Sequence, residues 1–149
     1  MAQKNKTRPH PGNVPRKEVP RPALPGADSS ADRLCWRFTH ADHGGPWCFH
    51  EISPDELCGV LEQLGNFESM TVNEVFNGGY PGKDYDIESI PNKEAQGRLH
   101  AIKLADQTRI SRLQLGGTQR LYGFRHGNVF HIVWWDPRHE IWPSRKRNT

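Results

Sequence analysis

Two runs of alternating side chains, separated by His126-Gly127, constrain the fold of this chain more than any other feature. Residues 118–125 and 128–135 each place apolar groups at every second position, and the glycine between them suits a tight turn. Such a pattern predicts an antiparallel β-hairpin. With His126-Gly127 as the loop, Tyr122 is expected to pair with His131 across the two strands.

The alternation sorts the hairpin side chains onto two faces. One face is apolar and is expected to pack on a core; it carries Leu121, Phe130, Ile132 and Trp134. The other face mixes cationic, polar and aromatic groups; it carries Arg120, Tyr122, Phe124, Val129, His131, Val133 and Trp135. Mixed basic and aromatic sheet faces are typical of nucleic-acid binding. The alternative is a solvent-facing surface whose residues have ordinary partners.

Three helices are expected ahead of the hairpin, and each begins at a polar residue. These capping residues are Ser53, Thr71 and Asn92. Glu56 and Glu74 lie three positions after the first two caps and complete capping boxes. The first helix has an apolar stripe formed by Leu57, Val60, Leu61 and Leu64, and it is expected to end at Gly65.

The remaining segments complete an α+β domain. Short strands are expected over 34–38 and 47–52, joined at Gly44-Gly45-Pro46, and another strand over 110–115 precedes the hairpin. Residues 78–91 read as a long polar loop. Helices followed by consecutive strands predict N-terminal helices packed on a C-terminal antiparallel β-meander.

A basic, proline-rich segment precedes this domain. Residues 1–33 hold six of the 12 prolines and almost no large apolar side chains, whereas all five tryptophans lie in residues 34–149. The first segment cannot bury enough surface to offset its ordering entropy. We therefore expect a disordered tail over 1–33 and a single α+β domain over 34–149.

Charge is unevenly distributed along the chain. The formal net charge is +4 in residues 1–33, −7 in residues 34–100 and +6 in residues 101–149. A basic C-terminal part favours a polyanionic partner, and mutual neutralisation within the fold explains the pattern equally well.

Hydrophobicity and cysteine usage indicate a compartment. No apolar run approaches the roughly 20 residues that span a bilayer, and the N-terminus lacks the apolar stretch of a secretory signal. The three cysteines are an odd number and are expected to be reduced thiols. A cytoplasmic protein with no membrane partner is therefore expected.

Two strand arginines suggest phosphate chemistry. Arg112 lies on the strand before the hairpin, and if that strand neighbours the hairpin it joins Arg120 on the polar face. Guanidinium groups bind phosphate in bidentate fashion. His131 or His139 would supply an imidazole whose ordinary pKa suits proton transfer.

A second set of residues raises the alternative of a metal site. Cysteine and histidine both bind zinc, and five of them fall close together: Cys35, His40, His43, Cys48 and His50. No Cys-x-x-Cys pair is present, and the spacings fit no familiar zinc finger. A small buried cysteine with surface histidines is the favoured interpretation, and no cofactor or metal is expected.

Four segments carry a family resemblance. Residues 95–99, 112–117, 120–125 and 129–140 read AQGRL, RLQLGG, RLYGFR and VFHIVWWDPRHE. They resemble uncharacterised prokaryotic proteins that look like the RelE/ParE toxin superfamily, over about residues 34–144. The resemblance implies helices ahead of an antiparallel sheet. RelE-like members of the superfamily cut mRNA without a metal, and ParE-like members bind DNA gyrase.

The resemblance also implies catalytic roles. Arg112 and Arg120 look like the strand arginines that hold phosphate, and His131 or His139 would stand for the acid–base group near the C-terminus. The expected function is that of a toxin–antitoxin system toxin, an mRNA endonuclease that needs no metal. RNA or the ribosome would be its target, and a cognate antitoxin its partner.

Further residues of the hairpin and of the turn after it would contact nucleic acid. Tyr122 and Trp135 would stack on bases, and Arg125 and Arg138 would contribute positive charge. The alternative function is a non-enzymatic protein- or nucleic-acid-binding module, for example a gyrase-type inhibitor.

Overall fold

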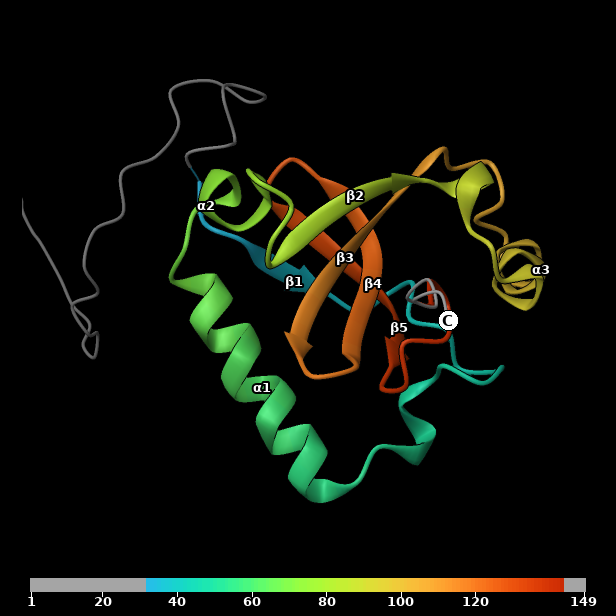
Figure 1. The fold of residues 1–149 in the computed structure, drawn as a ribbon, viewed down its shortest axis with the longest axis horizontal. Helices are drawn as coiled ribbons and strands as arrows, with labels where there is room; N and C mark the ends of the chain where they lie inside the picture. The colour runs from blue at the N-terminus through green and yellow to red at the C-terminus, as the bar shows by residue number, and fades with distance from the viewer. Residues whose placement is uncertain (1–31, 144–149) are drawn as a thin grey trace, which may run out of the picture.

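The computed structural model describes residues 32–143, which form an α+β fold, as the sequence predicted (Figure 1). Its helices are α1 (Pro54–Glu68), α2 (Val72–Phe76) and α3 (Lys93–Ala101). Its strands are β1 (Cys35–Arg37), β2 (Gly82–Asp86), β3 (Arg109–Gly116), β4 (Gln119–His126) and β5 (Val129–Asp136). The predicted tail over 1–33 lies outside the described residues except for residues 32 and 33.

The five strands form one mixed sheet with the order β1-β5-β4-β3-β2. β1 pairs in parallel with β5, and the other neighbours are antiparallel. The predicted C-terminal antiparallel meander is present as β3, β4 and β5, and the parallel edge strand β1 makes the whole sheet mixed. Residues 47–52 do not form the expected strand, because Phe49–Glu51 is a 3₁₀ helix, and the polar loop predicted over 78–91 contains the edge strand β2.

The helix starts are as predicted, because they depend on local hydrogen bonds. Ser53 and Glu56 form a reciprocal capping box, as do Thr71 and Glu74. The predicted end of α1 at Gly65 is wrong, since the helix continues to Glu68. Leu64 and Phe67 are both buried, and their packing outweighs the cost of about 1 kcal/mol for a glycine inside a helix.

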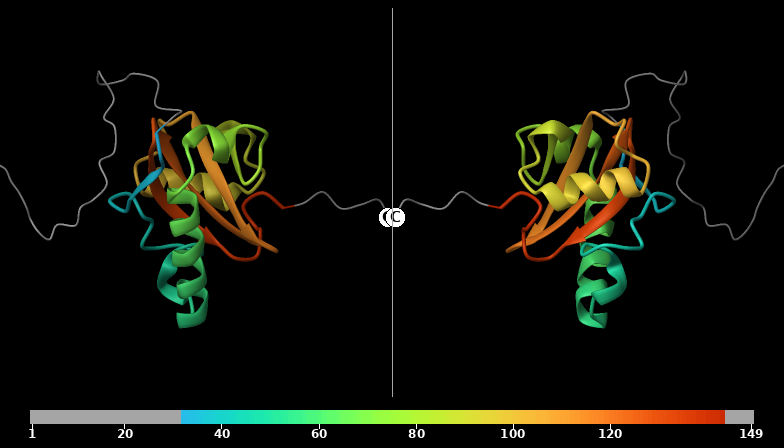
Figure 2. Two further views of the ribbon diagram at one scale, coloured as in Figure 1. Left: turned by 90° about the vertical axis from the view of Figure 1, so that its left-hand side faces the viewer. Right: turned by 90° about the vertical axis from the view of Figure 1, so that its right-hand side faces the viewer.

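Both faces of the sheet are covered (Figures 1 and 2). α1 and α2 cover one face, in a core that includes Val60, Leu64, Phe67, Val75, Leu121, Phe130, Ile132 and Trp135. α3 and the segment around Trp47 cover the other, in a core that includes Leu99, Ile110, Tyr122, Phe124, Val133, Trp134 and Ile141. The hairpin face predicted to work in solvent is therefore largely buried under this second layer.

The hairpin is present, but its register differs from the prediction. His126 pairs with Val129, so the turn is formed by the next two residues, 127 and 128, and Phe124 pairs with His131. Further along, Gly123 pairs with Ile132 while Tyr122 pairs with Trp134, which leaves Val133 as an extra residue in a β-bulge.

The bulge reverses the predicted faces of the two adjacent tryptophans. Trp134 pairs with Tyr122 and lies in the core beneath α3, whereas Trp135 pairs with Leu121 and lies in the core beneath α1. A bulge shifts every later side chain of a strand to the opposite face, because the side-chain period of a strand is two.

Gly123 makes the bulge possible, and we expect Gly123→Ala to destabilise the protein by about 3 kcal/mol. A Cβ at this position would overlap the carbonyl oxygen of His131 and contact the Phe130 ring. Gly97→Ala is the matched control, because a Cβ there meets nothing within 4 Å on α3 and alanine favours helix. Urea unfolding of both variants checks the prediction, which fails if Gly123→Ala unfolds with the wild-type midpoint.

Candidate functional site

Six polar side chains gather at one end of the sheet face beneath α3, and we name this group the arginine cluster. It consists of Tyr85, Arg112, Arg120, Tyr122, Asp136 and His139. Arg112 is opposite Tyr122 in the β3–β4 ladder, and Arg120 is opposite Asp136 in the β4–β5 ladder. Directly opposed residues share a face, so the three central strands assemble the cluster.

The two arginines are held by neutral oxygens. Arg112 is 8% exposed and donates from Nη1 to the Tyr85 hydroxyl at 2.8 Å and from Nη2 to the Gly79 carbonyl at 3.2 Å. Arg120 is 7% exposed and donates from Nη1 to the carbonyls of Gly117 and Gln119 at 2.7 and 3.0 Å. The Nε atoms of both arginines are buried and have no hydrogen-bond partner among the described residues.

Three other arginines among the described residues form ion pairs with carboxylates. The pairs are Arg98 with Asp42, Arg109 with Asp86 and Arg125 with Asp84. Arg112 and Arg120 have no such ion pair with any residue of 32–143. Burial lowers the pKa of Arg120, the charge of Arg112 lowers it further, and the carboxyl group of Asp136 opposes this shift. A bound anion would offset both the burial of these charges and their mutual repulsion.

Two tyrosines flank the guanidinium groups. The Tyr122 hydroxyl is buried without a partner among the described residues, and burial raises its pKa, so it remains a proton donor at neutral pH. Tyr85 stacks on Trp142 with ring centroids 3.9 Å apart, and the Lys83 ammonium lies 5.2 Å from the centre of the Tyr85 ring. The cluster therefore combines cations, hydroxyl donors and a stacked aromatic pair.

The turn after β5 brings His139 to the cluster. Asp136 is fully buried and accepts backbone N–H bonds from Glu140 and Ile141, both at 2.9 Å, which fixes the turn. Burial raises the pKa of Asp136. Burial lowers the pKa of His139, the charge of Arg120 adds to this, and Asp136 opposes it. A neutral imidazole beside two guanidinium groups can accept a proton.

The structure separates the two histidines that the sequence proposed as alternatives. His139 lies in the arginine cluster, whereas His131 pairs with Phe124 further along the same sheet face, close to His40. Three residue pairs of the β4–β5 ladder separate Phe124 from Arg120. His131 is therefore not in position to act with the arginines.

The remaining predicted nucleic-acid contacts lie mostly outside the cluster. Trp135 is 2% exposed in the core beneath α1 and stacks near Phe49, so its predicted role as an exposed stacking platform is wrong. Arg125 donates to Asp84 at 2.6 Å and lies over the Phe76 ring. Arg138 lies in the turn beside His139, and Tyr122, although in the cluster, is too deeply buried to stack on a base.

Two of the cluster residues, Tyr85 and Asp136, were not predicted from the sequence. Tyr85 belongs to β2, whose sequence of mostly polar residues looks like a loop because it is an edge strand with one ladder partner. Asp136 precedes a proline, and its sequence context indicates only a turn. Asp136 is buried because the turn folds back onto β5, and the neighbouring residues in the sequence do not predict this contact.

The fold bears on two features considered from the sequence, a metal site and a membrane-spanning helix. Among residues 32–143, no group of three or more histidine, cysteine, aspartate or glutamate side chains could hold a metal ion, so the Cys and His residues between 35 and 50 do not converge. No helix in this part of the chain is long and apolar enough to cross a bilayer.

Comparison of the chain with protein-family models, curated proteins and solved structures returns no match. The geometry of the arginine cluster is therefore the basis for assigning its role.

Proposed function

We propose that this protein binds RNA through the arginine cluster and cleaves it without a metal. The observation that carries the proposal is the pair of buried guanidinium groups with no carboxylate partner in residues 32–143, beside the His139 imidazole. Buried charges normally form ion pairs with groups of opposite charge. Two neighbouring guanidinium groups that lack such an ion pair are suited to an anionic ligand such as a phosphodiester. Arg112 and Arg120 would hold the non-bridging oxygens of that phosphodiester.

The proposed reaction uses the RNA's own nucleophile. The 2′-hydroxyl oxygen attacks the adjacent phosphorus, and the bond to the 5′-oxygen of the next nucleotide breaks. His139 accepts the proton of the 2′-hydroxyl, and water protonates the departing 5′-oxygen. Arg112 and Arg120 stabilise the charge that develops on the phosphoryl oxygens. The products are a 2′,3′-cyclic phosphate and a 5′-hydroxyl.

The resemblance to RelE-like toxins supports the same proposal and extends it. The segments that carry the resemblance contain five of the six cluster residues, namely Arg112, Arg120, Tyr122, Asp136 and His139. We therefore propose mRNA, free or on the ribosome, as the substrate and a cognate antitoxin as the partner that restrains the activity.

Incubation of end-labelled RNA with the protein in EDTA tests the proposed function. We expect fragments that end in 2′,3′-cyclic phosphate and begin with 5′-hydroxyl, and we expect none from Arg120→Ala. Arg109→Ala is the matched control, because Arg109 is a surface arginine on β3 that pairs with Asp86. RNA that remains intact, both free in EDTA and on translating ribosomes in a magnesium-containing buffer, would refute cleavage.

The pH dependence of cleavage should reflect the titration of the His139 imidazole. Its pKa lies below the ordinary 6.5, chiefly because of burial. Only the neutral imidazole can accept a proton, so kcat/KM should fall as the pH drops through this lowered pKa, with an acid limb below pH 6.5. His139→Gln should remove that limb along with most of the activity. An acid limb centred at or above pH 6.5 would contradict the assignment.

One observation favours a second candidate function, protein binding through α1. Leu57 and Leu61 are 41% and 57% exposed on α1, and this helix also carries several acidic residues. Part of α1 extends beyond the sheet (Figure 1). Exposed apolar side chains on one helix face are typical of a partner-binding surface. Growth arrest that persists when Arg112, Arg120 and His139 are all replaced would support this function over cleavage.

A further inference from the structure

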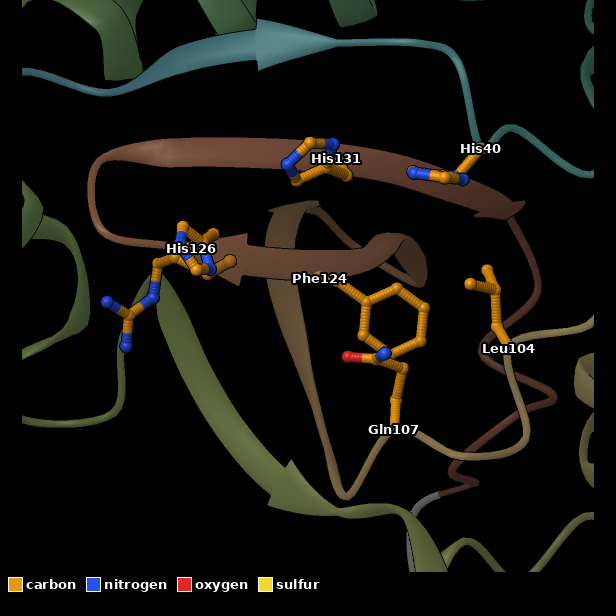
Figure 3. Close-up of a pocket in the computed structure, with 7 residues that line it drawn as sticks. His40, Leu104, Gln107, Phe124, His126 and His131 are labelled. Carbon is orange, nitrogen blue, oxygen red and sulfur yellow. The ribbon is translucent and has the colours of Figure 1, made fainter.

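A second polar site lies on the same sheet face, and we name it the histidine pocket (Figure 3). It has a volume of about 170 Å³. Its lining residues are His40, Leu104, Gln107, Phe124, Arg125, His126 and His131. They come from the segment after β1, the segment before β3, and the paired strands β4 and β5.

The lining suits a neutral heterocycle. Phe124 and His131 pair across the strands and provide aromatic walls, and the His40 ring lies 5.4 Å from the His131 ring, centroid to centroid. Gln107 contributes an exposed amide, which can both donate and accept a hydrogen bond. The His131 Nδ1 is buried and has no partner among the described residues, so it offers a further hydrogen-bonding group.

The charge state of the pocket points away from phosphate. Burial lowers the pKa of His131, and the neighbouring His40, Arg37 and His126 lower it further. The Arg125 guanidinium, which could otherwise attract an anion, is already paired with Asp84. An uncharged imidazole between aromatic walls favours stacking and hydrogen bonding to the edge of a base over binding of an anion.

The size of the pocket suits one ring system. A volume of 170 Å³ is several times the roughly 30 Å³ share of a water molecule. It is smaller than the roughly 300–1,000 Å³ of pockets that hold drug-sized ligands. A single base fits this range, and a base pair does not.

The spacing connects the pocket to the arginine cluster. Phe124 and Arg120 are four residues apart on β4 and point to the same face, which corresponds to about 13 Å at roughly 3.3 Å per residue. Tyr122 lies between them on this face and is fully buried under the layer that includes Trp47, so a strand that reaches both sites passes over that layer and spans more than about four nucleotides stacked at roughly 3.4 Å each. We propose that the histidine pocket holds one unpaired base of the RNA strand whose phosphate lies at the arginine cluster, and so gives the protein a base preference. This inference rests on the proposed function.

Binding of RNA that cannot be cleaved tests the inference separately from catalysis. Fluorescence anisotropy with 2′-O-methyl homopolymers of A, C, G and U, in EDTA, should show one base bound most tightly. Replacing His40 and Gln107 together by alanine should weaken the preferred polymer about tenfold and leave the weakest within about twofold. Both side chains are exposed, so the fold should survive. His43→Ala, an exposed histidine of the same loop, should change nothing.

Each other outcome overturns the inference in a distinguishable way. If the double variant keeps the wild-type preference, the pocket does not read a base, while RNA binding at the arginine cluster stands. If the wild type binds none of the polymers, the proposed function and this inference both fail. If a nucleoside alone binds as tightly as the polymer, the pocket is a free-nucleoside site and not part of an RNA path.

Discussion

Replacing Arg120 by methionine is expected to lower the rate of RNA cleavage by about 100- to 1,000-fold and yet leave the protein as stable as the wild type, or more stable by about 1 kcal/mol. Arg120 is 7% exposed, and the charge of Arg112 acts on it. A buried charge without an ionic partner costs folding free energy, and a flexible apolar side chain of similar length removes that cost. Loss of activity without loss of stability on replacement is typical of residues that serve function at the expense of stability.

Removing the hydrogen bonds of Arg120 should not reverse this result. Its two acceptors are the carbonyls of Gly117 in the β3–β4 turn and of Gln119 at the start of β4, where water can replace the guanidinium. Arg109→Met serves as the control, since the Arg109 side chain is 60% exposed and its replacement should change neither stability nor cleavage appreciably. Thermal unfolding and cleavage assays provide both readouts. A decrease of several kcal/mol in the free energy of unfolding of Arg120→Met would show that Arg120 has a structural role.

Asp42→Asn should reduce the free energy of unfolding by about 3–5 kcal/mol, the usual cost of removing one partner from a buried ion pair. Asp42 is 2% exposed and accepts from Arg98 at 2.6 and 3.0 Å and from the Trp134 indole at 2.9 Å. These bonds attach the segment after β1 to α3 and β5. The free energy of unfolding of a native domain is only about 5–15 kcal/mol in total, so the variant should unfold at much lower urea concentrations than the wild type.

The control for Asp42→Asn is Asp86→Asn, which removes an exposed ion pair with Arg109 and should lower the free energy of unfolding by less than about 1 kcal/mol.

Burial alone would raise the pKa of Asp42, but the hydrogen bonds from Arg98, Trp134 and Gly44 outweigh this effect and lower the pKa below 3.8. Its stabilisation is therefore complete above pH 3.8 and diminishes as the pH falls through the lowered pKa. The wild type and Asp42→Asn should converge in acid, and a constant difference would contradict the ion pair.

The features that the sequence predicted well are local ones. The capping boxes at Ser53 and Thr71 depend on residues three positions apart, and the hairpin depends on alternation within two adjacent runs. The shared face of Arg112 and Arg120 was predictable because β3 and β4 are consecutive strands, and consecutive strands usually pair.

The features that the sequence did not predict depend on distant contacts. The faces of Trp134 and Trp135 depend on the bulge at Val133, for which Gly123 in the facing strand was the available signal. The choice between His131 and His139 depends on the way the 137–141 turn folds back over β4 and β5, through Asp136. The parallel pairing of β1 with β5 joins segments that lie far apart in the sequence.

The most direct test of the account is the salt dependence of RNA affinity. Wild type and the Arg112→Met/Arg120→Met double variant would be titrated with 2′-O-methyl RNA from low to high salt in EDTA. If the arginine cluster holds phosphate, the plot of log K against log salt concentration becomes shallower in the variant by about 0.7 for each phosphate that the cluster no longer neutralises. An unchanged affinity and slope in a folded double variant would contradict phosphate binding at the cluster.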